Sequence, residues 1–343
     1  MLARGMKQIL LLGGTGWLGQ TLSRQVLDRG HAVTALARGT QPFVPGVSAV
    51  IADRQAPGAY GQVAGRAWDL VIELTDRPRF AREAVQHLGG AAANWVFVSS
   101  CSAYALQSEP GADETAGTAE PLPEAEDGED ADFGRAKSAC EALSMHERNG
   151  RALVVRPGLI GGPGDPSGRS TYWPLRFARR RDPVLVPAVP NGNAHVQIID
   201  VRDLAAFILD AGLAGEHGYV NAVGELHTLG QTLEMAREAA AAVAASTGHP
   251  APAHQLVGYD VSKMAGDRVN AWAGPASLPL LLPQEDGYAG FARRSDARAL
   301  RLGLNRRSLR QTFEEIIRAG GGIDVDSLRS GLTAAEEQML LGR

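Results

Sequence analysis

Three of the four glycines at residues 13–19 carry the clearest chemical signal in this chain. They follow an apolar run at 9–12, precede a segment with helical spacing, and read Gly13-x-x-Gly16-x-x-Gly19. Between a strand and a helix, this spacing indicates a dinucleotide-binding turn. Glycine lets a diphosphate approach the main chain, and free N–H groups at the helix start attract its negative charge. A tight turn without a ligand is the alternative. We assign the diphosphate of a cofactor to Gly13, Thr15, Gly16, Trp17, Leu18 and Gly19.

The residue that follows the next β-rich run favours one nicotinamide nucleotide over the other. In an NAD site, an acidic residue about 20 positions beyond the glycines binds the ribose 2′-hydroxyl. This chain has Ala37 there, followed by Arg38. A carboxylate would repel a 2′-phosphate, whereas a guanidinium pairs with it through two charge-assisted hydrogen bonds. The sequence therefore predicts NADPH, with NADH as a weaker cofactor; a solvated charge at a strand end is the alternative for Arg38.

The segments that must position these residues alternate between two periodicities. Short β-rich runs at 8–12, 31–37, 48–52, 69–74, 94–99 and 152–156 are separated by helical patterns at 17–29, 79–88 and 134–149. This alternation predicts an α/β fold, a doubly wound parallel sheet of the Rossmann type with helices on both faces. Right-handed crossovers then place the ligand at the C-terminal edge of the strands. Residues 1–160 are predicted to form the NADP-binding domain.

Beyond residue 160 the rhythm loosens. Helical patterns are expected at 201–213, 229–246, 296–302 and 308–319, and a last helix begins at Thr333 with the capping box Thr333-x-x-Glu336. Residues 161–343 are therefore predicted to form mainly a smaller C-terminal substrate-binding lobe, with some elements returning to the sheet.

Residues 107–132 interrupt the alternation just before the helical pattern at 134–149. They contain ten carboxylates, three prolines and no lysine or arginine. Such a stretch is expected to be a solvated and mobile loop that repels itself. Its functional alternative is a flap over the site, since it joins two segments that carry candidate chemistry.

Composition excludes several classes of protein. The 343 residues are 44% hydrophobic and 21% charged, enough for one large or two moderate domains. A net charge of −4 argues against non-specific nucleic-acid binding. No apolar run approaches the roughly 18 residues of a membrane span, and the start of the chain does not resemble an export signal. Cys101 and Cys140 form neither a disulfide framework nor a metal cluster. We expect a cytoplasmic protein with buried thiols, no metal, and a small molecule rather than a nucleic acid or membrane as partner; its oligomeric state stays open.

Several further motifs occur in one order along the chain. They are the glycine turn, Ser99-Ser100 followed by Tyr104, Lys137, Arg156-Pro-Gly-Leu-Ile160 with Tyr172-Trp-Pro174, and the segment 196–203. With these motifs the chain resembles the extended, atypical short-chain dehydrogenase/reductases of the NAD(P)-dependent epimerase/dehydratase-like branch. The resemblance spans most of residues 8–320.

The resemblance implies roles for individual residues. Ser100 would bind the substrate oxygen, and Lys137 would hold the nicotinamide ribose. Further cofactor contacts are expected from Asp53, Leu74, Ser99, Pro157 and Gly158. In this family a tyrosine four residues before the lysine gives or takes the proton. Here that position is Phe133, and a benzene ring has no proton to give, so the ordinary acid–base route is missing.

Three functions are compatible with this loss. The first is a reductase, because hydride transfer is the chemistry of the cofactor while the protein orients it; the proton would come from Ser100, Tyr104, water or the substrate. The second is a non-catalytic NADP(H)-binding sensor or scaffold. The third is a nucleotide-sugar epimerase or dehydratase, whose repeated proton shuttling suffers most from the missing tyrosine. We favour the reductase because the cofactor half of the site is complete.

The substrate side is marked by aromatic residues. Tyr104, Tyr172, Trp173 and His195 fall in segments expected to border the nicotinamide end. Aromatic side chains there suit a flat, apolar ligand, although packing between the two lobes is an equal alternative. The resulting hypothesis is a ketoreductase of secondary metabolism that acts on a bulky aromatic ketone of the angucyclinone polyketide type, in antibiotic biosynthesis.

Overall fold

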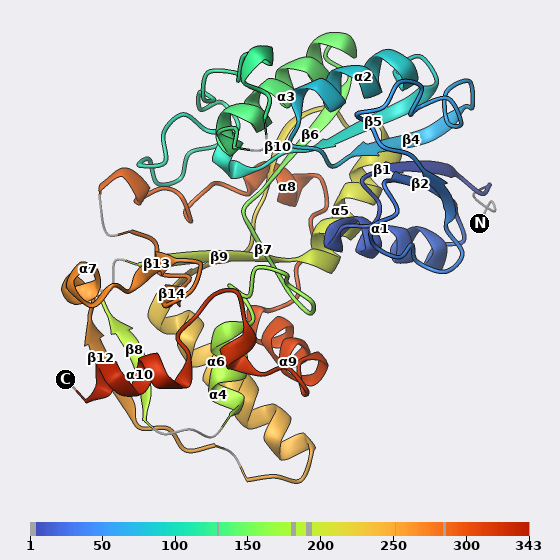
Figure 1. Ribbon diagram of the computed structural model, residues 1–343. Helices are drawn as coiled ribbons and strands as arrows, with labels where there is room; N and C mark the ends of the chain where they lie inside the picture. The colour runs from blue at the N-terminus through green and yellow to red at the C-terminus, as the bar shows by residue number, and fades with distance from the viewer. Residues whose placement is uncertain are drawn as a thin grey trace. The chain divides into compact units, whose positions relative to one another are not determined.

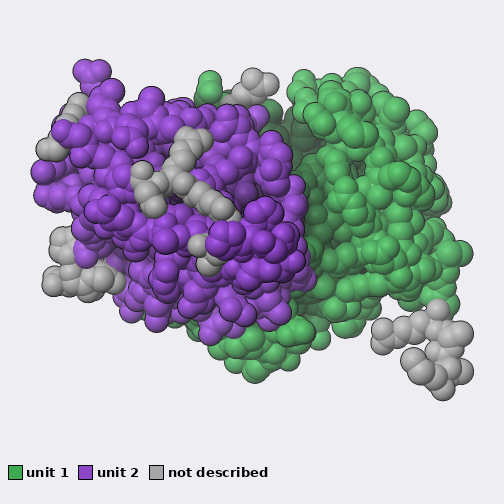
Figure 2. Space-filling model, turned by 90° about the horizontal axis from the view of Figure 1, so that it is seen from below, with its two compact units in different colours: residues 1–158, 201–223, 294–305 green, residues 159–200, 224–293, 306–343 purple. Residues whose placement is uncertain are grey.

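The computed structural model describes residues 5–128, 130–179, 183–189, 194–250, 252–283 and 286–342. The chain folds into two compact units (Figures 1 and 2). Unit 1 comprises residues 1–158, 201–223 and 294–305, and unit 2 comprises residues 159–200, 224–293 and 306–343. The first break in unit 1 therefore falls two residues before the end of the predicted NADP-binding domain.

Unit 1 is built on a seven-stranded sheet in which every neighbouring pair of strands is parallel. Its order is β10-β6-β5-β4-β1-β2-β3. The strands are β1 (Gln8–Leu12), β2 (Ala32–Ala37), β3 (Ser48–Ile51), β4 (Trp68–Glu73), β5 (Ala92–Val98), β6 (Ala152–Pro157) and β10 (Gly218–Ala222). The central strands are continuous apolar runs because helices cover the sheet on both faces. The predicted Rossmann-type fold is confirmed.

Helices cover both faces of this sheet. Figure 1 shows α2 (Pro78–Leu88) and α3 (Phe133–Glu147) on one face, and α1 (Trp17–Asp28) and α5 (Val201–Ala214) on the other. Helix α2 starts with a proline, which lacks the N–H that a first-turn residue leaves unpaired anyway. Helix α3 starts where the side chain of Asp132 accepts a hydrogen bond from the backbone N–H of Arg135. The short α8 (Ala297–Arg301) also belongs to unit 1. These helices lie within two residues of their predicted bounds.

The strand order fixes where a ligand binds in such a sheet. The order reverses between β1 and β4, because the chain runs outward from β1 to β3 and then returns to add β4 on the other side. Open parallel sheets bind ligands at this switch point, beyond the carboxyl ends of the strands. The glycine turn after β1 and the segment 74–77 after β4 both lie there.

Unit 2 contains smaller sheets around its own hydrophobic core. Its strands are β7 (Leu159–Gly161), β8 (Val184–Ala188), β9 (His195–Asp200), β11 (Leu226–Thr228), β12 (Leu256–Asp260), β13 (Asn270–Trp272) and β14 (Ser277–Pro279). Its helices are α4 (Tyr172–Ala178), α6 (Leu229–Ser246), α7 (Met264–Asp267), α9 (Leu309–Ala319) and α10 (Ala334–Leu341). The capping box expected at Thr333 is present. Among the described residues, no helix is long and apolar enough to cross a membrane.

The acidic stretch is not the self-repelling loop that its composition predicts. Asp127 pairs with Arg77, Glu124 with Arg82, and Glu126 with Arg135. The stretch also forms backbone hydrogen bonds next to Tyr104, and Leu122 is buried against α3. The expectation fails because arginines on α2, α3 and the turn before α2 supply the missing opposite charge. Glu129 lies outside the described residues.

Candidate cofactor and catalytic site

The glycine turn has the shape that a diphosphate requires. Gly13 has a φ of +98°, which favours glycine. A Cβ on Gly19 would lie 2.6 Å from the carbonyl oxygen of Gly13, so only glycine lets α1 start so close to the turn. A Cβ on Gly16 would meet only that same oxygen, at 3.8 Å, within 4 Å. The space in front of Gly16 is therefore open at the start of a helix.

Within its own first turn, α1 has neither a capping side chain nor an acidic residue. Gly16 occupies the N-cap without a side-chain hydrogen bond, and the first turn has no acidic residue. The remaining assigned residues, Thr15, Trp17 and Leu18, are partly exposed on this turn. Uncapped N–H groups at a helix start form an anion site, so the turn fits a diphosphate.

Two arginines lie near the adenosine end, and the structure separates their roles. Arg38, directly after β2, is exposed and makes no hydrogen bond or ion pair with the part of the chain that the structure describes. Arg54 is 8% exposed and donates to Glu73, Tyr60 and the carbonyl of Phe80. Arg38 is therefore the arginine here that can meet a phosphate.

Two further predicted cofactor residues follow β3 and β4. Asp53 is exposed, and its carboxylate accepts the backbone N–H of Gln55. Leu74 is partly exposed and lies against the glycine turn, because a Cβ on Gly13 would stand 3.4 Å from its Cβ. The Leu74 N–H donates to the carbonyl of Leu12, which ties the ends of β1 and β4 together.

Lys137 is a buried ammonium held by main-chain oxygens. Its Nζ donates to the carbonyl of Thr75 at 2.8 Å and to that of Val98 at 2.8 Å. It is 5% exposed, and burial lowers the pKa of its ammonium below the ordinary value for lysine. An ammonium has three N–H donors, and these two bonds leave one for a ligand. The expected ribose-binding lysine is thus fixed at the carboxyl ends of β4 and β5.

The two serines after β5 differ in what their hydroxyls do. Ser99 is buried, and its Oγ donates to Oε1 of Glu141 at 2.5 Å. That carboxylate also binds Arg156 of β6, so the Ser99 hydroxyl belongs to a buried network. Ser100 is partly exposed, and its Oγ accepts from the backbone N–H of Ser102 at 3.0 Å. The Ser100 hydroxyl hydrogen stays available to a substrate oxygen.

Phe133 stands where the family's tyrosine would stand. It is the first residue of α3, and its side chain is 48% exposed. The Lys137 Nζ lies 5.8 Å from the centre of its ring. The position is therefore accessible and next to the lysine, but it carries no hydroxyl.

Tyr104 lies inside unit 1 instead of lining an open site. It is 2% exposed, and its hydroxyl donates to Oδ1 of Asn221 at 2.7 Å. Arg156 and Arg294 lie over its ring, at 4.6 Å and 4.3 Å from the centre. Burial raises the pKa of the Tyr104 hydroxyl, which makes it a poorer acid. In this conformation the ring packs inward and its hydroxyl is occupied, which argues against a substrate contact or proton source; both roles stay predictions.

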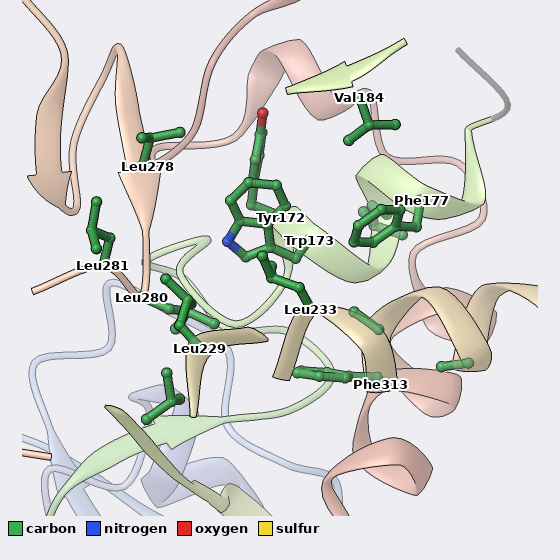
Figure 3. Packing of buried hydrophobic residues seen from close by; sticks show 14 of the residues in the cluster. Tyr172, Trp173, Phe177, Val184, Leu229, Leu233, Leu278, Leu280, Leu281 and Phe313 are labelled. Atoms are coloured by element: carbon green, nitrogen blue, oxygen red, sulfur yellow. The ribbon is translucent and has the colours of Figure 1, made fainter. Parts of the chain in front are cut away.

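The aromatic residues predicted on the substrate side of unit 2 are core residues. Tyr172 is 1% exposed and Trp173 is fully buried, among Phe177, Leu233 and Leu278 (Figure 3). The Trp173 indole N–H donates to the carbonyl of Pro279. Both residues are therefore packed inside unit 2, and their role as substrate contacts stays a prediction. His195, at the start of β9, is partly exposed and stays a prediction.

Pro157 and Gly158 end β6, with Pro157 buried and Gly158 partly exposed. Sequence reasoning missed Thr75 and Glu141, which hold Lys137 and Ser99. The i, i+4 spacing of Lys137 and Glu141 places both on one face of a helix and could have indicated the second of them.

These residues together suit a nicotinamide dinucleotide. The start of α1, which has no side-chain cap, and the remaining donor of Lys137 are the N–H groups that its diphosphate and ribose would need. Cys101 and Cys140 are free and buried as expected, and burial raises the pKa of the Cys101 thiol to about 12. Neither thiol is therefore a candidate acid or nucleophile.

Comparison with known proteins agrees with this assignment. The model of the NAD dependent epimerase/dehydratase family matches residues 9–224, more than half of the chain. None of the curated proteins matches the sequence.

Solved structures share the fold at low sequence identity. WbmG of Bordetella bronchiseptica in complex with NAD has a TM-score of 0.64 and 16% identity, over 95% of this chain and 97% of WbmG. UDP-N-acetylglucosamine 4-epimerase of Bacillus cereus has a TM-score of 0.61 and 17% identity, over 93% and 98%. Thermus thermophilus UDP-glucose 4-epimerase in complex with NAD has a TM-score of 0.60 and 17% identity, over 92% and 100%.

Proposed function

Because the chain belongs to the NAD-dependent epimerase/dehydratase family, we propose that it is a nicotinamide-dependent oxidoreductase that reduces a ketone without a catalytic tyrosine. The observation that carries this proposal is the exposed Phe133 beside the buried, hydrogen-bonded Lys137. Reduction of a ketone needs one hydride and one proton, and neither step requires a base that works in both directions.

The residues of the chain divide the work as follows. A bound nicotinamide supplies the hydride. Lys137 holds the ribose through its remaining N–H donor, and its two bonds to Thr75 and Val98 fix the direction of that donor. The Ser100 hydroxyl donates to the ketone oxygen and stabilises the charge that develops on it. The proton then comes from water, from the substrate or from Ser100, because Tyr104 is occupied by Asn221.

NADPH is the proposed cofactor, and Arg38 is the residue that supports it. Its guanidinium is exposed and unpaired within the described part of the chain, whereas Arg54 forms an ion pair with Glu73. We expect Arg38→Asp to raise the dissociation constant of NADPH by more than about tenfold and to leave that of NADH nearly unchanged, since a charge-assisted bond contributes about 1.5–3 kcal/mol. Fluorescence titration with both nucleotides measures this, and equal effects on the two would contradict the assignment.

The proposed substrate is an aromatic ketone. A bulky aromatic ketone with a neighbouring phenol could share its own proton as the hydride arrives, which would offset the missing general acid. The exposed ring of Phe133 supports such a flat, apolar ligand.

A nucleotide-sugar epimerase is the second candidate, and the comparisons favour it. Two of the similar structures are described as UDP-sugar 4-epimerases. An epimerase of this kind must remove a proton and return it, and among the residues described around Lys137 neither Phe133 nor Tyr104 can do so. This difference in proton chemistry is the reason for proposing reduction, although the similar structures are epimerases.

A single panel separates these functions. The protein is incubated with NADPH and either aromatic hydroxyketones or UDP-sugars, and absorbance near 340 nm reports oxidation of the nicotinamide. Loss of absorbance with a ketone supports the reductase. Conversion of a UDP-sugar without net loss of absorbance, seen by NMR of the sugar, supports the epimerase. Binding of NADPH without either reaction would leave a sensor and overturn the proposal of an enzyme.

A further inference from the structure

Arg54 and Glu73 form a buried ion pair next to the turn 74–77, whose Thr75 carbonyl binds Lys137. Glu73, the last residue of β4, is fully buried, and its carboxylate accepts from Arg54 at 2.9 Å and 2.6 Å. Arg54 is itself enclosed between aromatic rings, with its guanidinium 4.9 Å from the ring centre of Phe80 and 5.5 Å from that of Tyr60. Burial alone would lower the pKa of Arg54, but the Glu73 carboxylate outweighs this effect and raises it. Arg54 therefore stays charged in the interior.

The same carboxylate reaches the turn after β4. Its Oε1 also accepts the backbone N–H of Thr75 at 3.0 Å. Arg54 donates to the carbonyl of Phe80 at 2.6 Å, so the pair binds both the start of the turn 74–77 and the first turn of α2. The Thr75 hydroxyl accepts the N–H of Arg77 at 3.0 Å and completes the turn.

On its other side, this turn faces the cofactor site. The Thr75 carbonyl accepts from Lys137, and Leu74 lies against Gly13 of the glycine turn. The N–H that Glu73 accepts belongs to the peptide group that joins Leu74 to Thr75. Within Thr75 itself, the N–H binds the buried carboxylate while the carbonyl binds the ammonium.

Such an arrangement needs a reason other than stability. Replacing a buried ion pair by apolar residues of similar volume is often neutral or stabilising, so an ion pair of this kind is weak support for a fold. A carboxylate, unlike an apolar side chain, can accept the Thr75 N–H while Arg54 holds it in place.

We propose that Glu73 and Arg54 are positioning residues that set the Thr75 carbonyl, and through it the Lys137 ammonium, for the nicotinamide ribose. This inference rests on the cofactor site of the proposed function and not on the identity of the substrate. Neither residue touches the cofactor; each acts through the turn 74–77.

The test compares two double variants that both remove the buried charges. Arg54→Met with Glu73→Leu removes the acceptor of the Thr75 N–H, whereas Arg54→Met with Glu73→Gln keeps an amide oxygen for it. We expect the first pair to raise the dissociation constant of NADPH about tenfold, the effect of one lost hydrogen bond, and the second pair to restore most of the affinity. Arg54→Lys, which keeps the charge but loses the two-pronged fork, is the milder variant and should cost about threefold.

A second readout follows Lys137 directly and needs no cofactor. The chain has three lysines, Lys7, Lys137 and Lys263, so NMR of protein with ¹⁵N-labelled lysine resolves each side chain, and Lys137→Met assigns the signal. The Glu73 charge raises the pKa of Lys137, so its loss should lower the pH at which Lys137 titrates in both pairs. The Glu73→Leu pair should lower it further than the Glu73→Gln pair, because the ammonium also loses a fixed carbonyl.

The matched control is the buried ion pair of unit 2, Arg176 with Glu337 at 2.8 Å. Arg176→Met with Glu337→Leu should leave both the NADPH affinity and the Lys137 titration unchanged. An unchanged affinity and titration in the folded Glu73→Leu pair would overturn the inference, as would an equal loss in the unit 2 control. If no ketone is reduced but the series behaves as expected, the proposed reaction fails and the positioning role stands.

Discussion

Two aromatic side chains of unit 1 differ in position and in chemistry. The one that lies exposed next to Lys137 has no hydroxyl, and the one that has a hydroxyl lies in the interior. Phe133, at the start of α3, is exposed and next to Lys137 but has no proton to give. Tyr104, just after β5, has the hydroxyl but is buried and bound to Asn221. The comparison teaches that exposure and ring chemistry must be assigned separately. It also leaves Lys137 and Ser100 as the polar groups of the proposed reaction.

The largest expected effect comes from Lys137, the residue beside the ring of Phe133. Lys137→Met keeps the aliphatic volume but removes the ammonium and leaves the carbonyls of Thr75 and Val98 unpaired. We expect kcat/KM to fall about 100-fold, the effect of a misplaced ligand. Steady-state kinetics measure this, with Lys263→Met, at an exposed lysine, as the control. Unchanged kinetics would show that Lys137 and the neighbouring ring of Phe133 do not lie near the bound cofactor and ketone.

Ser100→Ala should have the next largest effect. It removes the hydroxyl offered to the ketone oxygen, and we expect kcat to fall about tenfold with little change in NADPH affinity. Ser102→Ala is the control, since it keeps the backbone N–H that Ser100 accepts. A complete loss of turnover would instead identify Ser100 as the proton donor, in place of either aromatic residue.

Tyr104→Phe tests the buried ring. The variant keeps the stacking of Arg156 and Arg294 but leaves Oδ1 of the buried Asn221 without its donor. A buried acceptor left unpaired costs about 1–3 kcal/mol, so Tm should fall by a few degrees while turnover stays the same. Calorimetry and kinetics on the same sample check both. A large loss of turnover at unchanged Tm would return Tyr104 to the reaction.

Phe133→Tyr should have the smallest effect. The added hydroxyl lies at an exposed position, so the fold is unaffected, and turnover should stay within about threefold because the proton has another source. Pre-steady-state measurement of NADPH oxidation gives the rate of the chemical step. A gain of about 10²–10⁴-fold, typical of general acid catalysis, would show a damaged active site and not a different one.

The parts of the molecule that the sequence predicts well are those with a strict local cause. The glycine turn follows from φ and from close approach, as Gly13 and Gly19 show. The buried strands of the sheet follow from apolar runs such as Ile9 to Leu12, and α1, α2 and α3 from helical spacing.

The remaining features depend on partners far away in the sequence. Strand β10 was missed because Gly218–Ala222 carries little strand signal, and its place is set by pairing with β6. The direction in which Tyr104 and Trp173 point is set by Asn221 and by the carbonyl of Pro279, each more than 100 positions away. Thr75 gave no signal at all, since its function lies in its backbone.

The interrupted path of the chain through unit 1 has a consequence for synthesis. Strand β10 covers one side of β6 but is made only after residues 159–200, which belong to the other unit. During translation, the edge of β6 that later pairs with β10 therefore has unpaired backbone N–H and C=O groups. Such an edge can pair with strands of other molecules. A shortened polypeptide that stops at residue 158 would keep this edge permanently and should aggregate, although it contains the whole glycine turn and Lys137.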